Sequence, residues 1–271
     1  MSEKRGAQQQ PAFVLHQWDW SETSLILDLF TRDQGRVAAV AKGAKRPYSQ
    51  LRPVLMPFQR IQVAFNRGRS DEQGDIQTLR SAEYAAAGQR LPPARLFPGF
   101  YLNELLMKLL ARGDAHAGLF DAYADTLQAL AGGDADPDDQ APLRAFELRL
   151  LRETGVLPEL DRDTITQAPL QTGRAYLLQP EGGLVAAGRA GHAATGRDEP
   201  SLGAAQCQAL ERALARADMA ALRLACRGSQ PALRQQLRGL LAHQIGSPML
   251  RTRQVMLDVR RLLDPVAAST A

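Results

Sequence analysis

Residues 24–41, SLILDLFTRDQGRVAAVA, decide the fold that we expect for this chain of 271 residues. Two apolar runs, residues 24–31 and 36–41, stand on either side of the turn signal Arg32-Asp33-Gln34-Gly35. Short apolar runs separated by a polar turn that ends in glycine are typical of a β-hairpin. The stretch therefore predicts two antiparallel strands joined by a tight turn.

Three further strand signals surround this hairpin. An apolar run opens at residues 13–15, and residues 58–65 (FQRIQVAF) alternate with period two. A polar hairpin at residues 66–75 then leads to residues 76–79 as the closing strand. Five short strands within about eighty residues favour a small barrel of the oligonucleotide-binding (OB) type, and an SH3-like barrel stays open as an alternative.

The period of the apolar residues becomes helical after Pro92. Broad apolar stripes occupy residues 101–110 and 119–130, and a third helix over residues 143–154 is ended by Gly155. These segments predict a helical region that follows the barrel.

The last third of the chain mixes one hairpin with helices. The hairpin is expected within residues 173–191, with its turn at Glu181-Gly182-Gly183. Pro231 suits the start of a later helix that Gly246 ends, and a last helix is expected over residues 249–263.

Together these signals predict an α+β fold: an N-terminal five-stranded OB-type β-barrel followed by a helical domain with a small inserted β-hairpin. We expect four parts along the chain. They are an OB-fold nucleic-acid-binding domain (1–85), a central helical domain (90–160), a small hairpin and loop module (161–205), and C-terminal helices that pack on the helical domain (206–271).

Composition excludes several classes of protein. A hydrophobic content of 45% can build a sizeable core. No stretch approaches the roughly 18 apolar residues of a membrane span, and the start MSEKRGAQQQ lacks the apolar run of a secretory signal. Cys207 and Cys226 lie far apart without a CxxC pattern, so we interpret them as buried thiols in a reducing compartment. We expect a soluble cytoplasmic protein.

Positive charge is concentrated in one window of the sequence. Residues 34–70 hold eight basic side chains and no acidic one; the whole chain carries only +4, so the rest has a net charge of −4. The eight are Arg36, Lys42, Lys45, Arg46, Arg52, Arg60, Arg67 and Arg69. A basic surface on a β scaffold favours a phosphate-rich partner, because each neutralised phosphate releases a condensed counterion. The alternative is a solubilising surface of exposed strands.

Aromatic residues are interleaved with the basic ones. Tyr48, Trp18 and Trp20 could stack nucleic-acid bases or fill a core, and the two tryptophans share one strand face. Phe58 and Phe65 are expected to face inward.

The usual catalytic constellations do not occur in this sequence. There is no GxxxxGKS/T, GxSxG, HExxH or DxDxDG pattern, and the single glycine of Lys42-Gly43-Ala44-Lys45 cannot form a phosphate-binding nest. The four histidines are scattered singly. A group of acidic residues precedes the basic window, and we interpret its members as solvated charges without a catalytic role: Asp19, Glu22, Asp28 and Asp33. No catalytic residue, metal ligand or cofactor is predicted.

Several segments, read in order, resemble the RecO family of bacterial recombination mediator proteins. They are AFVLHQWDWSETSLILDLFTRDQGRVAAVAKGAKRPYSQLRPVLMPF, GFYLNELLMKLL, LFDAYADTLQAL, LRAFELRLLRETGV and LLAHQIGSPMLRTRQVM. The resemblance covers nearly the whole chain and implies an OB barrel, a central helical domain and, in many members, a cysteine-bearing zinc module. Here Asp161-Arg162-Asp163 stands where the cysteines would begin. We therefore expect a zinc-less version of that module, held by packing alone.

The resemblance also implies a function. Such a protein has no enzymatic activity; it binds single- and double-stranded DNA, anneals complementary strands and engages the acidic tail of the single-stranded DNA-binding protein (SSB). With its partner RecR, and with RecF at gaps, it helps load the recombinase RecA on SSB-coated DNA at the nucleoid.

Carried over to this chain, the segment AKGAKRPYSQLRP places four basic residues on the DNA-facing surface: Lys42, Lys45, Arg46 and Arg52. The other four of the window are added from charge alone. For the SSB tail we expect a helical groove with an apolar floor and an arginine rim. Residues 143–154 offer Arg144, Leu148, Arg149 and Arg152, for which a solvated helix face is the alternative.

Two other functions stay open at this point. One is an RNA-binding module of the OB class, and the other, less favoured, is a nuclease or nucleotide hydrolase. A nuclease would need a carboxylate cluster for metal ions beside the basic surface.

Overall fold

The computed structural model describes residues 9–66, 76–85, 90–132, 139–188, 200–228, 230–247 and 249–263. The chain divides into two compact units, Met1–Ala131 and Gly132–Ala271. The four domain boundaries expected from the sequence stay a prediction.

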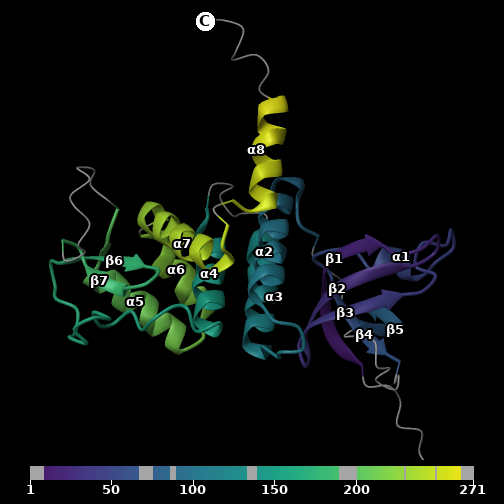
Figure 1. The fold of residues 1–271 in the computed structure, drawn as a ribbon, viewed down its shortest axis with the longest axis horizontal. Helices are drawn as coiled ribbons and strands as arrows, with labels where there is room; N and C mark the ends of the chain where they lie inside the picture. Colours follow the sequence, from purple (N-terminus) through teal and green to yellow (C-terminus); the bar gives the residue numbers. More distant parts are fainter. Residues whose placement is uncertain are drawn as a thin grey trace, which may run out of the picture. The chain divides into compact units, whose positions relative to one another are not determined.

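Unit 1 contains a closed barrel of five strands (Figure 1). The strands are β1 (Gln10–Asp19), β2 (Leu25–Thr31), β3 (Gly35–Ala41), β4 (Arg60–Phe65) and β5 (Ile76–Tyr84). Their order around the barrel is β1-β2-β3-β5-β4, with β3 and β5 parallel and the remaining barrel pairs antiparallel. The predicted five-stranded OB-type barrel is confirmed.

The hairpin predicted from residues 24–41 forms β2 and β3. Its register runs from Leu25 opposite Ala41 to Thr31 opposite Gly35. The Thr31 hydroxyl donates to the Gly35 carbonyl at 2.9 Å and accepts from the Gln34 amide at 3.2 Å. Gly35 has a φ of +65°, which L side chains rarely adopt, so the turn needs glycine there.

The barrel interior is filled by every second residue of the strands, as period two requires. Leu27, Leu29 and Ala39 are fully buried in this core, and Ile61 and Val63 complete it from β4. Phe65 also faces this core, as expected. The residues between them point out of the barrel and form the outer face of each strand.

Helices cover part of that outer face. Unit 1 adds the short helix α1 (Leu51–Val54), the 3-10 turn η1 (Pro93–Arg95), α2 (Leu96–Leu109) and α3 (Ala117–Ala131). Phe13 of β1 packs against Phe120 and Tyr123 of α3 with ring centroids 5.1 and 5.0 Å away. Asn103 of α2 accepts a hydrogen bond from the buried Tyr123 hydroxyl and donates to the Leu15 carbonyl at 2.9 Å. These contacts fix α2 and α3 to strand β1.

Unit 2 is organised around α4 (Ala141–Glu153), which is buried along almost all of its length. Four more helices follow: α5 (Ala204–Ala215), α6 (Met219–Arg227), α7 (Gln230–Ile245) and α8 (Arg251–Leu263). A separate small sheet has the order β7-β6-β8, from β6 (Ala175–Gln179), β7 (Gly183–Ala186) and β8 (Leu202–Gly203). In Figure 1 the label β7 lies beside β6, with helices α4 to α7 close to this sheet.

The predicted hairpin of this unit is confirmed, since β6 and β7 pair around residues 180–182. Strand β8 was not predicted, because two residues are too few to show a period. Pro231 is the second residue of α7, and Gly246 follows its end with a φ of +69°. Among the parts of the chain that the structure describes, no helix has both the length and the apolar character to cross a bilayer.

Candidate nucleic-acid interface

The loop that follows β3 carries the densest group of basic side chains expected to face DNA. Lys42 and Arg46 are exposed and Lys45 is half-buried. Gly43 has a φ of +73°, and the Arg46 side chain folds back over it, with Cδ 3.6 Å from the position that a Cβ on Gly43 would take. The three side chains Lys42, Lys45 and Arg46 are called the basic loop below.

Lys45 ties the basic loop to the turn between β1 and β2. Its amide donates to the Thr23 carbonyl at 3.0 Å, and its ammonium group donates to the Ser21 carbonyl at 3.2 Å. The ammonium also lies 3.0 Å from the Asp19 carboxylate, which is 78% exposed. An ion pair this exposed is weak, so the phosphate of a partner can compete for Lys45.

Arg36 is in a different environment from the one expected for it. Its guanidinium makes two hydrogen bonds, of 2.9 and 2.8 Å, to the carboxylate of Asp28, which has no exposed surface. It also donates to the carbonyls of Met107 and Leu110 at the end of α2. These hydrogen bonds occupy the guanidinium, so it is not available to bind a phosphate. Arg36 is therefore not part of the proposed interface.

Of the remaining members of the window, Arg52 and Arg60 lie on other elements than the basic loop. Arg52 is exposed on α1. Arg60 lies opposite Phe13, with its guanidinium carbon 5.6 Å from the Phe120 ring centre. Since Phe13 is six residues from Asp19 along β1, Arg60 is roughly 20 Å from the basic loop at about 3.3 Å per residue. Arg67 and Arg69 lie outside the described residues.

The window contains no acidic residue in the sequence, but two of its basic side chains have acidic neighbours in the folded structure. Strand pairing brings Asp28 to Arg36, and the turn brings Asp19 to Lys45. The interpretation of Asp28 as a solvated charge was wrong, because α2 and Arg36 cover it. The register of the predicted hairpin could have indicated this ion pair. Phe30 is opposite Arg36, which puts Asp28 diagonally across from Arg36 on the same face of the sheet.

Exposed aromatic rings lie in the same two loops. Trp18 and Trp20, at the end of β1 and just after it, are 43% and 63% exposed, and Tyr48 in the loop after β3 is 94% exposed. Phe58 and Phe65 are buried, as predicted.

The arginines of α4 do not form an open rim. Arg144 pairs with the buried Glu147 at 2.8 Å, Arg149 pairs with Glu153, and Arg152 pairs with Glu211 at 2.7 Å. Leu148 is fully buried. The helix is therefore neither the expected groove nor the solvated face that was its alternative, because it is the interior helix of unit 2. A binding place for an acidic tail stays a prediction without a location.

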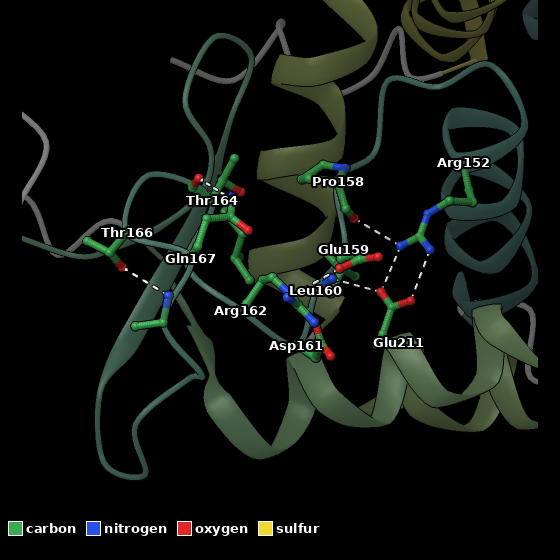
Figure 2. Close-up of polar contacts among 12 residues, drawn as sticks. Arg152, Pro158, Glu159, Leu160, Asp161, Arg162, Thr164, Thr166, Gln167 and Glu211 are labelled. Carbon is green, nitrogen blue, oxygen red and sulfur yellow. Dashed lines mark hydrogen bonds and ion pairs between the residues drawn. The ribbon is translucent and has the colours of Figure 1, made fainter.

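Figure 2 shows residues 158–167, around the start of the module in which we expected no zinc ligands. Glu211 of α5 accepts from the Leu160 amide and from the Arg152 guanidinium, both at 2.7 Å, and Arg152 also donates to the Pro158 carbonyl at 2.9 Å. Burial by itself would raise the pKa of Glu211, but the hydrogen bonds from Arg152 and Leu160 outweigh it and hold this pKa below its ordinary value.

Asp163 is the centre of a second set of hydrogen bonds. Its carboxylate accepts from the amides of Ile165, Thr166 and Ala186 at 3.1, 2.9 and 3.2 Å. Burial opposes ionisation, yet the hydrogen bonds from Thr166, Ala186 and Ile165 lower the pKa of Asp163. The carboxylate is thus used to join the loop to strand β7.

The side chains that the structure describes in this module do not form a zinc site. Cys207 of α5 and Cys226 of α6 are buried, and burial raises the pKa of both thiols to about 12. The Asp163 carboxylate is already engaged by three amides. Within the described ranges, no group of three or more His, Cys, Asp or Glu residues could hold a metal ion.

Comparison with known proteins gives the same family over both units. Residues 4–87 match the family model "Recombination protein O N terminal", and residues 92–254 match "Recombination protein O C terminal". Three relatives are each named "DNA repair protein RecO". The protein of Delftia acidovorans is 47% identical over 97% of this chain and 100% of its own length. Those of Verminephrobacter eiseniae and Variovorax paradoxus are 49% and 48% identical, each over 93% of this chain and 96% of its own length. The OB-type barrel, the helical second unit and these matches agree, and the chain belongs to the RecO family of DNA repair proteins.

Proposed function

We propose that this chain is a DNA-annealing recombination mediator that works without catalytic turnover. It binds single- and double-stranded DNA, anneals complementary strands and helps load RecA on SSB-coated DNA. RecR and the acidic tail of SSB are its proposed partners, with RecF acting at gaps. Family membership supports this activity, and the basic loop is the observation on this chain that carries it.

The basic loop suits a DNA backbone for physical reasons. Lys42 and Arg46 are exposed, and the only acidic partner that the described contacts give Lys45 is the exposed carboxylate of Asp19. Phosphates bound there release counterions, which supplies binding free energy that does not depend on base sequence. A protein that binds both strands in this way can bring complementary strands together without hydrolysing a nucleotide.

An annealing assay tests the proposal. Complementary fluorescent oligonucleotides, each coated with SSB, are mixed with the protein in the absence of ATP. We expect faster duplex formation with both strands intact. Cleaved strands, or acceleration only when ATP is added, would contradict the proposal. Stronger binding to RNA than to DNA of the same sequence would favour the RNA-binding alternative.

A further inference from the structure

The two tryptophans of this chain are both exposed and lie close together in sequence at one end of the barrel. The sequence has no other tryptophan. Trp18 is 43% exposed near the end of β1, and Trp20, just past that strand, is 63% exposed. A large apolar ring left in water forgoes the free energy that burial would give it, so two at one place point to a partner.

Hydrogen bonds hold the turn after β1, which carries Trp20, beside the basic loop. The Trp20 amide donates to the Ser24 carbonyl at 3.2 Å, which closes the turn after β1. The same turn receives the Lys45 amide at Thr23 and the Lys45 ammonium at Ser21. Residues 18–24 and 42–48 are therefore neighbouring segments, and both carry exposed aromatic or basic side chains.

Trp18 extends this surface along the outer face of the sheet. The register places Trp18 opposite Ile26, Ile26 opposite Val40, and Val40 opposite Thr78, so these four side chains form one row across β1, β2, β3 and β5. Ile26, Val40 and Thr78 are all partly exposed. His16 contacts the Trp18 ring edge-on, with centroids 4.5 Å apart. Three of the four side chains are apolar, and the row is partly exposed.

Other exposed aromatic rings have partners that explain their positions. Phe100 contacts Phe58 edge-on, with ring centroids 4.9 Å apart, and the Tyr84 hydroxyl donates to the Pro53 carbonyl at 2.6 Å. Among the residues that the structure describes, no ring contact is made by Trp20 or by Tyr48, which is 94% exposed.

We propose that Trp18 and Trp20 stack on the bases of single-stranded DNA while Lys42 and Arg46 bind its phosphates, with Tyr48 as an additional stacking ring. This inference rests on the proposed DNA-binding function and specifies the substrate class of that site. Unpaired bases expose their faces, whereas a duplex hides them between neighbouring pairs, so the surface prefers single strands. Stacking of this kind does not depend on base identity, as strand annealing requires.

Tryptophan fluorescence tests the inference directly, because both fluorophores lie in the proposed site. The intact protein is titrated with an oligothymidine, with an oligonucleotide of equal length in which most sites are abasic, and with a duplex. We expect strong quenching by oligothymidine and little by the abasic strand, which keeps the phosphates and loses the bases. Trp18→Phe and Trp20→Phe each leave one tryptophan, so the quenching at each position is measured separately.

Binding is followed in parallel by anisotropy of a labelled strand. Trp20→Leu should weaken binding to oligothymidine roughly 5- to 150-fold, the range expected for one stacked base, while duplex binding changes little. Trp20→Phe should retain most of the affinity, and its unchanged circular dichroism spectrum serves as the folding control. Binding of oligothymidine without quenching, or equal quenching by the abasic strand or the duplex, would overturn the stacking inference and leave DNA binding in place. No binding to any strand would overturn the proposed function as well.

Discussion

Arg36 of β3 binds both carboxylate oxygens of Asp28 of β2, at 2.9 and 2.8 Å, and the carboxylate is fully buried. The same guanidinium donates to the carbonyls of Met107 and Leu110, which are left without helical partners at the end of α2. Arg112 approaches Asp28 at 3.5 Å from the following segment. The pair thus joins the barrel hairpin to the helix that covers it.

Substitution of Arg36 should therefore lower the free energy of unfolding, and not only the affinity for DNA. Arg36→Ala leaves a buried carboxylate with only the longer contact from Arg112, and we expect the free energy of unfolding to fall by about 3–5 kcal/mol. Urea denaturation measures it. Arg46→Ala is the matched control, since its exposed side chain should change stability by less than about 0.5 kcal/mol. Equal effects of the two substitutions would show that the buried pair is not stabilising.

The barrel could be predicted from the sequence because its signals are local. Period-two alternation over residues 58–65 and the turn at residues 32–35 each lie within a few residues, and the structure has strands at both places. Helix ends were likewise marked by single residues such as Gly246. Local backbone preference and the alternation of buried and exposed residues both depend on a few neighbouring residues. A short stretch of sequence is therefore enough to predict a strand or a turn.

The roles of individual charges could not be predicted, because they depend on partners distant in sequence. Arg152 is paired by Glu211, 59 residues away, and Arg36 reaches carbonyls on α2 more than 70 residues away. Burial of α4 depends on the helices that surround it, although its arginines suggested a surface. The DNA-binding role of the basic loop stays a prediction, and only the contacts in the structure distinguish the exposed Lys42 and Arg46 from the partly buried Arg36.

Charge removal from the basic loop should change the salt dependence of DNA binding. Lys42→Ala and Arg46→Ala should each weaken binding to any DNA sequence and reduce the slope of log K against log salt by about 0.7 for single strands. Fluorescence anisotropy at several salt concentrations gives the slope. Arg216→Ala, an exposed arginine of unit 2, is the control and should leave the slope unchanged. A slope that is the same in all three variants would remove these two residues from the interface.

Glu211 should make stability depend on pH in the acid range. Its pKa in the folded state is lowered, so its contribution is fully present above the unfolded value of about 4.3 and is lost as the pH falls through the folded value. At pH 7 Glu211→Gln should cost about 2 kcal/mol, the worth of hydrogen bonds to a charged group, and the difference from the unaltered protein should shrink toward pH 3. Glu159→Gln, at an exposed ion pair, provides the control. A difference that is constant with pH would contradict this role of the carboxylate.

Asp163 should stabilise the loop between α4 and the small sheet. Asp163→Ala leaves the amides of Ile165, Thr166 and Ala186 without their acceptor, and we expect a loss of about 1–3 kcal/mol or more in unfolding free energy. Hydrogen exchange at these three amides locates the effect, which should appear there before it appears in the barrel. Asp161→Ala, whose carboxylate is 46% exposed, should leave their protection unchanged. Unchanged exchange in Asp163→Ala would mean that the carboxylate does not hold the loop.

Gly35 and Gly113 allow a test of the contact between the hairpin and the segment after α2. Both have positive φ, +65° and +75°, so alanine at either position carries a backbone cost of about 1–2 kcal/mol. At Gly113 a Cβ would meet nothing within 4 Å, whereas at Gly35 it would lie 1.7 Å from the Asp114 carbonyl oxygen. Gly35→Ala must therefore displace backbone as well as strain it, and its loss of stability should clearly exceed that of Gly113→Ala. Comparable losses of unfolding free energy in urea denaturation would show that the Asp114 segment moves away from the added Cβ at little cost. In that case the hydrogen bonds from Arg36 to the Met107 and Leu110 carbonyls, and not close packing at the turn, would hold the end of α2 to the hairpin.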